Sequence, residues 1–98
     1  MADHPQAFLD SLDQASPPAD VCGLLVAVWH GLRGEWELAH KIAQDDPTAD
    51  GAWVHAWLHR IEGDLANAAY WYRRADKPQA SDSTRLEGER IARSLLAR

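Results

Sequence analysis

The fold is decided by two stretches that repeat one another at an offset of 29 residues, "AVWHGLRGEWELAHKIA" at residues 27–43 and "AWLHRIEGDLANAAYWY" at residues 56–72. Each stretch places a small residue on either side of a central glycine, which lets two helices approach closely and makes the turn between them. An acidic residue follows each glycine and suits the positive end of the second helix. The matched positions are Ala27 with Ala56, His30 with His59, Gly34 with Gly63, Glu35 with Asp64, and Ala39 with Ala68. The repeat predicts two antiparallel helix pairs.

The rest of the chain also shows helical periodicity, and no segment has the alternation typical of a strand. We therefore expect an all-α fold of about six helices, in which antiparallel pairs form a short stack and terminal helices cover its open ends. The single domain, residues 1–98, is expected to hold an N-terminal helix at 5–15, a first pair at 20–47, a second pair at 50–78 and a C-terminal capping helix at 83–97.

Capping residues predict where two of these helices begin. Asp20 is a suitable N-cap for a helix that starts at Val21. Thr84 and Glu87 have capping-box spacing for the last helix, in which Gly88 costs about 1 kcal/mol relative to alanine. On the second helix of the second pair, Leu65 is expected to face the core.

The paired helices resemble the tetratricopeptide repeat. The residues that carry the resemblance are Gly34, Glu35, Ala39 and Pro47 in the first copy and Gly63, Asp64, Ala68, Tyr72, Ala75 and Pro78 in the second. The resemblance implies a right-handed stack in which the first helix of each pair lines a groove that holds a partner peptide. It extends to small bacterial proteins of this type and implies no particular activity. The chain departs from the family in its shorter period and in the histidines that replace an aromatic residue, His30 and His59.

Net charge and hydropathy exclude several classes of partner. The formal net charge of −5 argues against nucleic acid, because phosphate binding requires a basic surface. The longest apolar run, "GLLVAVW" at 23–29, is too short to span a membrane, and the N-terminus lacks the pattern of a signal peptide. We expect a soluble, cytoplasmic, non-enzymatic protein without a cofactor, with another protein or peptide as its partner or a second copy in a homodimer.

The stretch "WVHAWLHRIEGD", residues 53–64, carries the main candidate for binding. Trp53, Trp57 and Arg60 form one stripe of the predicted helix, with Tyr70 at its edge, and tryptophan and arginine dominate interaction hot spots. The stripe predicts a face that binds a helix or peptide of a partner. Two alternatives stay open, because both tryptophans could belong to the core or to a dimer interface.

A neighbouring stripe of the same helix carries a weaker candidate. His55, His59 and Glu62 follow one another at helical spacing. Two imidazoles one turn apart can bind a zinc ion, with the carboxylate as a third ligand, so a metal-binding protein or an enzyme is an alternative function. The pattern lacks the glutamate that accompanies the zinc-protease helix, so structural histidines are the favoured interpretation. His40 is expected to be a core residue of the first pair.

Overall fold

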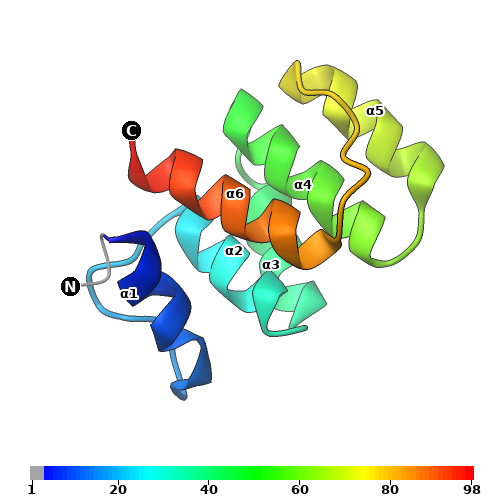
Figure 1. Ribbon diagram of the computed structural model, residues 1–98. Helices are drawn as coiled ribbons and strands as arrows, with labels where there is room; N and C mark the ends of the chain where they lie inside the picture. Colours follow the sequence, from blue (N-terminus) through cyan, green and yellow to red (C-terminus); the bar gives the residue numbers. More distant parts are fainter. Residues whose placement is uncertain (1–3) are drawn as a thin grey trace.

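The computed structural model describes residues 4–98, which form six α-helices and one short 3-10 helix (Figure 1). No strand occurs in this range, so the prediction of an all-α fold is confirmed. None of the helices between residues 4 and 98 is long and apolar enough to cross a membrane. The elements are α1 (Pro5–Asp10), the 3-10 helix η1 (Ser11–Asp13), α2 (Leu24–Leu32), α3 (Trp36–Gln44), α4 (Ala49–Ile61), α5 (Leu65–Ala75) and α6 (Thr84–Leu96).

The repeat in the sequence corresponds to two helical hairpins, α2–α3 and α4–α5. In each turn a glycine adopts a positive φ, 80° in the first hairpin and 86° in the second, a conformation that glycine reaches without steric cost. The next residue donates its backbone N–H to the carbonyl of the histidine five positions earlier, at 2.9 Å and 3.0 Å. These turns are built by His30, Gly34 and Glu35 and by His59, Gly63 and Asp64.

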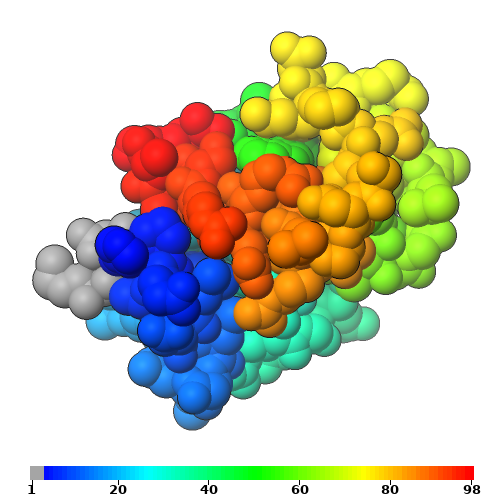
Figure 2. Space-filling model, in the orientation of Figure 1, coloured from blue at the N-terminus to red at the C-terminus, as the bar shows by residue number. Residues whose placement is uncertain are grey.

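The C-terminal helix lies across the first helices of both hairpins. α6 packs on α2 and α4, and α1 packs beside it. Figure 2 shows α6 at the front of the molecule, between the N-terminal segment and the segment that follows α5. Ile91 and Ala92 of α6 are fully buried against this layer. α6 thus covers the face formed by α2 and α4, and α1 lies against α6.

Three tryptophans fix the packing of the helices through their ring N–H groups, which need an acceptor when buried. The Trp29 N–H donates to the Ser11 hydroxyl at 3.0 Å and joins α2 to η1. The other two donate to backbone carbonyls: Trp36 to Leu58 at 2.6 Å, and Trp57 to Thr84 at 2.8 Å. The tryptophans therefore connect η1, α3 and α6 to the central helices.

The helix predicted to start at Val21 begins three residues later, so Asp20 does not cap it. Gly23 precedes α2 with φ 62° and ψ −137°, which is incompatible with a helical residue, and α2 starts at Leu24. The N-terminal helix is also shorter than expected, since α1 and η1 end at Asp13.

The start of α6 differs by one residue from the prediction. Ser83 is the N-cap, and its hydroxyl accepts the N–H of Leu86 at 3.1 Å. Thr84 is the first helical residue, and Glu87 points into the core instead of completing a capping box. Leu65, expected in the core, is 65% exposed at the first turn of α5.

Gly88 allows α6 to lie directly on Trp57 of α4. A Cβ atom at this position would lie 2.5 Å from Cζ2 of Trp57 and 2.7 Å from Cδ2 of Leu32. We expect Gly88→Ala to lower the free energy of unfolding by about 1–3 kcal/mol through overpacking, although alanine favours a helix by about 1 kcal/mol. Urea denaturation measures the change. The exposed Arg93→Ala in the same helix should stay within about 0.5 kcal/mol of wild type, and a Gly88→Ala protein as stable as wild type would contradict the prediction.

Candidate metal centre

Three histidines from two helices converge on one point. His55 and His59 lie one turn apart on the same face of α4, and His40 approaches them from α3. One ring nitrogen from each histidine lies within 4.8 Å of the other two. Nε2 of His40 and Nε2 of His55 are 3.0 Å apart and form a hydrogen bond. The cluster therefore offers three imidazole ligands at one place.

Tryptophans enclose the cluster on two sides. Trp36 stacks on His40 with ring centroids 4.5 Å apart and an interplanar angle of 11°. Trp71 stacks on His55 at 4.0 Å and 15°. His55 and His59 are only 6% and 7% exposed. The imidazoles are thus held by packing and shielded from solvent.

Burial keeps two of the imidazoles in their neutral form. Desolvation, followed by the proximity of His40 and His59, lowers the pKa of His55 from its usual value to about 4. The pKa of His40 is also lowered, first by desolvation and then by His59. Near neutral pH both rings are neutral, which is the form of imidazole that coordinates metals.

A carboxylate orients the third histidine. Nδ1 of His59 lies 2.6 Å from Oε1 of Glu62. A hydrogen bond from Nδ1–H to the carboxylate leaves Nε2 free for an ion, as is usual for metal-binding histidines. His30 makes the same contact with Glu35 at 2.8 Å, but among residues 4–98 it belongs to no group of three metal-binding side chains. The carboxylate contact is thus common to both hairpins, whereas the cluster is not.

The dimensions of the cluster fit a small transition-metal ion. Zinc–nitrogen bonds are about 2.0–2.1 Å long, so the nitrogens of a tetrahedral site lie about 3.3–3.4 Å apart. The observed separations, from 3.0 Å to at most 4.8 Å, bracket this value.

The structure brings together part of the predicted metal site and adds one residue. His55 and His59 lie together as hypothesised, and Glu62 contacts His59 from outside the cluster. His40, expected to be an ordinary core residue, supplies the third imidazole. Its side chain is partly buried between Trp36 and the two histidines of α4.

The two tryptophans predicted to form a binding face are covered by the chain itself. Trp57 is 1% exposed and lies beneath α6, as described above. Trp53 is 6% exposed, and Nζ of Lys77 lies 4.4 Å from the centroid of its ring. Their exposure, left open by the sequence, is therefore settled in favour of burial.

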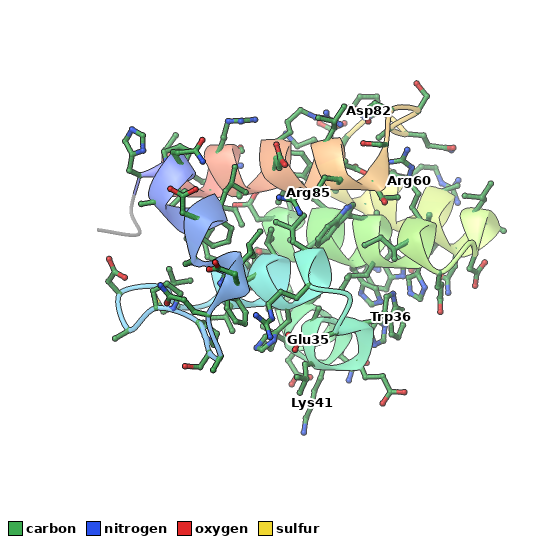
Figure 3. The ribbon with its side chains drawn as sticks, turned by 60° about the horizontal axis from the view of Figure 1, so that its bottom comes forward. Glu35, Trp36, Lys41, Arg60, Asp82 and Arg85 are labelled. Carbon is green, nitrogen blue, oxygen red and sulfur yellow. The ribbon has the colours of Figure 1, made fainter. Side chains whose placement is uncertain are left out.

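The other two predicted binding residues have different surroundings. Arg60 points toward the start of α6, on the same side as Asp82 (Figure 3). Its guanidinium donates to Glu87 at 2.8 Å. Tyr70 is 43% exposed, and its hydroxyl accepts a hydrogen bond from Arg74 at 3.1 Å. Of the four residues, Tyr70 alone has a largely accessible side chain.

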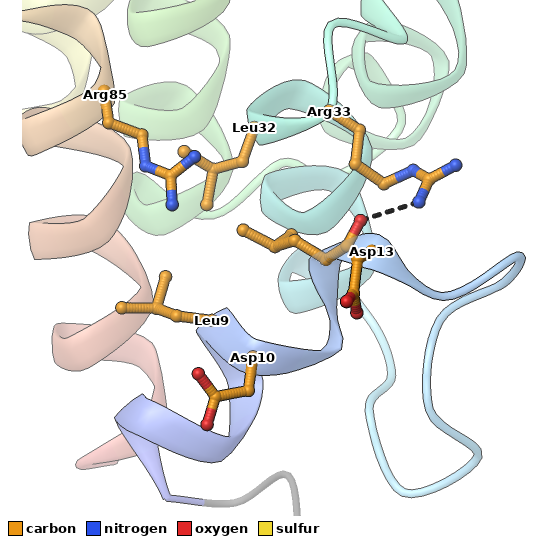
Figure 4. Close-up of a pocket in the computed structure, with 7 residues that line it drawn as sticks. Leu9, Asp10, Asp13, Leu32, Arg33 and Arg85 are labelled. Carbon is orange, nitrogen blue, oxygen red and sulfur yellow. Dashed lines mark hydrogen bonds between the residues drawn. The ribbon is translucent and has the colours of Figure 1, made fainter.

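A second candidate site is a cavity of about 560 Å³ between the N-terminal segment and the helices α2 and α6 (Figure 4). Its lining includes Arg33, whose guanidinium donates to the backbone carbonyls of Leu12, at 2.7 Å, and Gln14. Arg85, on the opposite side, pairs with Glu89 at 2.7 Å. Both guanidinium groups have intramolecular partners, so the histidine cluster remains the stronger candidate.

Comparison with known proteins assigns no family to the chain. No family model, curated protein or solved structure matches it. The chemistry of the histidine cluster therefore has to be interpreted from its own geometry.

Proposed function

We propose that the chain binds one divalent transition-metal ion through His40, His55 and His59. The observation that carries the proposal is the convergence of three ring nitrogens within 4.8 Å of one another. Nε2 of His40 and Nε2 of His55 share a hydrogen bond at 3.0 Å, which an ion between the rings would replace. Burial and the neighbouring rings lower the pKa of His40 and of His55, and an ion can use the lone pairs of the neutral rings.

The ligand set selects the class of metal. Imidazoles suit Zn²⁺, Cu²⁺ and Ni²⁺, whereas Mg²⁺ and Ca²⁺ prefer oxygen ligands. An ion at this position would join α3 of the first hairpin to α4 of the second. The proposal departs from the expectation of a chain without a cofactor and gives α4 a metal-binding role.

The test is a calorimetric titration of untagged, chelator-treated protein with Zn²⁺. We expect one ion per chain, and an affinity at least tenfold lower in each of His40→Ala, His55→Ala and His59→Ala. Glu62→Gln should weaken binding about 10–100-fold, as loss of a carboxylate behind a ligand commonly does.

His30→Ala provides the matched control. His30 occupies the equivalent repeat position to His59 and has the same kind of carboxylate partner, Glu35, but lies outside the cluster. Its replacement should leave zinc affinity unchanged. Absence of zinc binding to the wild type, or an equal loss in His30→Ala, would overturn the proposal.

We also propose that the two hairpins are tetratricopeptide-like. The matching turns at Gly34 and Gly63 support it. In this arrangement α6 occupies the face where the family would hold a peptide, so Trp57 and Arg60 would become available only after α6 leaves. Binding of a partner peptide, assembly through this face and a cytoplasmic location therefore stay predictions.

A further inference from the structure

The next inference rests on the proposed metal site and concerns its fourth ligand. Zinc sites in proteins are commonly tetrahedral, and a site with three protein ligands keeps one position for water or another small ligand. The cluster supplies three imidazoles. Glu62 is not a further ligand, because its carboxylate is hydrogen-bonded to Nδ1 of His59 and not placed beside Nε2. One position on the ion is therefore left for a ligand from outside the chain.

A cavity of about 230 Å³ lies beside the cluster, between the end of α3, the start of α4 and α5. His55 is the member of the histidine cluster that lines this cavity, Trp71 stacks on it, and Gln44 and Thr48 contribute polar groups. Because water occupies about 30 Å³ per molecule in the liquid, the cavity has room for a small organic molecule with several waters.

The charges around this cavity favour an anion once the ion is present. Arg74 is the one lysine or arginine among its lining residues, and its guanidinium lies 5.3 Å from the centroid of Trp71. This guanidinium donates to the Tyr70 hydroxyl at 3.1 Å, and within residues 4–98 no carboxylate lies within 4.0 Å of it. Asp46 also lines the cavity, but its Oδ1 accepts the N–H and the hydroxyl of Thr48 at 2.9 Å and 2.5 Å.

We propose that this cavity takes a small monocarboxylate, which completes the coordination of the ion and pairs with Arg74. The carboxylate would replace a water molecule on the metal, and the Arg74 guanidinium at the wall of the cavity would supply the opposite charge. Arginine suits this role because its fixed fork of N–H groups matches a carboxylate. The aromatic ring of Trp71 would contact the apolar part of the ligand.

The test uses protein loaded with Co²⁺, whose visible absorption bands respond to a change of ligand. Acetate is titrated at constant pH and ionic strength, with acetamide as the neutral analogue. We expect a saturable spectral change with acetate and none with acetamide. Arg74→Gln should weaken acetate binding at least tenfold while the affinity for Co²⁺ stays the same.

Arg73→Gln is the matched control, because Arg73 is exposed on the same helix and does not line the cavity. It should behave as wild type. The inference would be overturned if the spectrum of bound Co²⁺ did not change with acetate, or if Arg74→Gln bound acetate as tightly as the wild type. Either result would leave the proposed function standing. If Co²⁺ does not bind at all, the proposed function fails, and the inference fails with it.

Discussion

Glu87→Ala is expected to lower the free energy of unfolding by about 3–5 kcal/mol, as the loss of one partner of a buried ion pair commonly does. Glu87 is 1% exposed, and its carboxylate accepts the Arg60 guanidinium at 2.8 Å. The Tyr72 hydroxyl lies 2.6 and 2.7 Å from the two carboxylate oxygens. Burial, and then the hydrogen bond to Glu87, raise the pKa of Tyr72 and keep it a donor. The alanine variant leaves the Tyr72 hydroxyl without its carboxylate and Arg60 with only the more distant carboxylate of Asp82, at 4.0 Å.

Denaturation in guanidinium chloride, followed by circular dichroism, measures this loss. Glu89→Ala is the matched control, because Glu89 lies on the same helix and contacts Arg85 at the surface, where a salt bridge contributes about 0–1 kcal/mol. Glu87→Gln should lie between the two, since an amide oxygen can still accept from Tyr72. Equal losses in Glu87→Ala and Glu89→Ala would show that the buried network does not stabilise the fold.

The hairpins were predictable because their signals are local. Gly34 and Gly63 mark turns that need a positive φ, and the acidic residue after each marks the next helix. These signals act within a few residues along the chain. They do not depend on where the other helices pack.

The exposure of the tryptophan stripe was not predictable from such signals. Trp53, Trp57 and Arg60 were placed correctly on one side of α4, but that side is covered by α6 and the segment before it. Glu87 was interpreted as a capping residue, whereas its partner Arg60 is 27 residues away. A helical wheel shows which residues share a face and says nothing of what covers it.

The place of the third histidine has a signal in the sequence. His40 lies seven residues before Pro47, and His55 lies seven residues after Thr48. Two antiparallel helices joined at this turn bring such residues opposite one another. Combining the turn with the stripe on α4 would have predicted the cluster, although the tilt between α3 and α4 depends on long-range packing.

Zinc at a thousandfold excess over its dissociation constant is expected to raise the free energy of unfolding by about 4 kcal/mol, because the ion binds the folded state. For a domain of this size the melting temperature should rise by more than about 15 °C, since each kcal/mol is worth about 4–8 °C. The three ligands meet only when α3 and α4 are packed together, so the binding free energy contributes to folding. Differential scanning calorimetry with and without Zn²⁺ measures the shift.

The variants decide where such an ion binds. His40→Ala retains both histidines of α4 but removes the link to α3, so it should lose most of the zinc-induced shift, measured against the same variant without zinc. His30→Ala should retain the full shift. A second group, His59 with Glu62 and Asp64, lies at the turn after α4. If the shift survives in His40→Ala and disappears in Asp64→Ala, the ion binds at that turn and does not join the two hairpins.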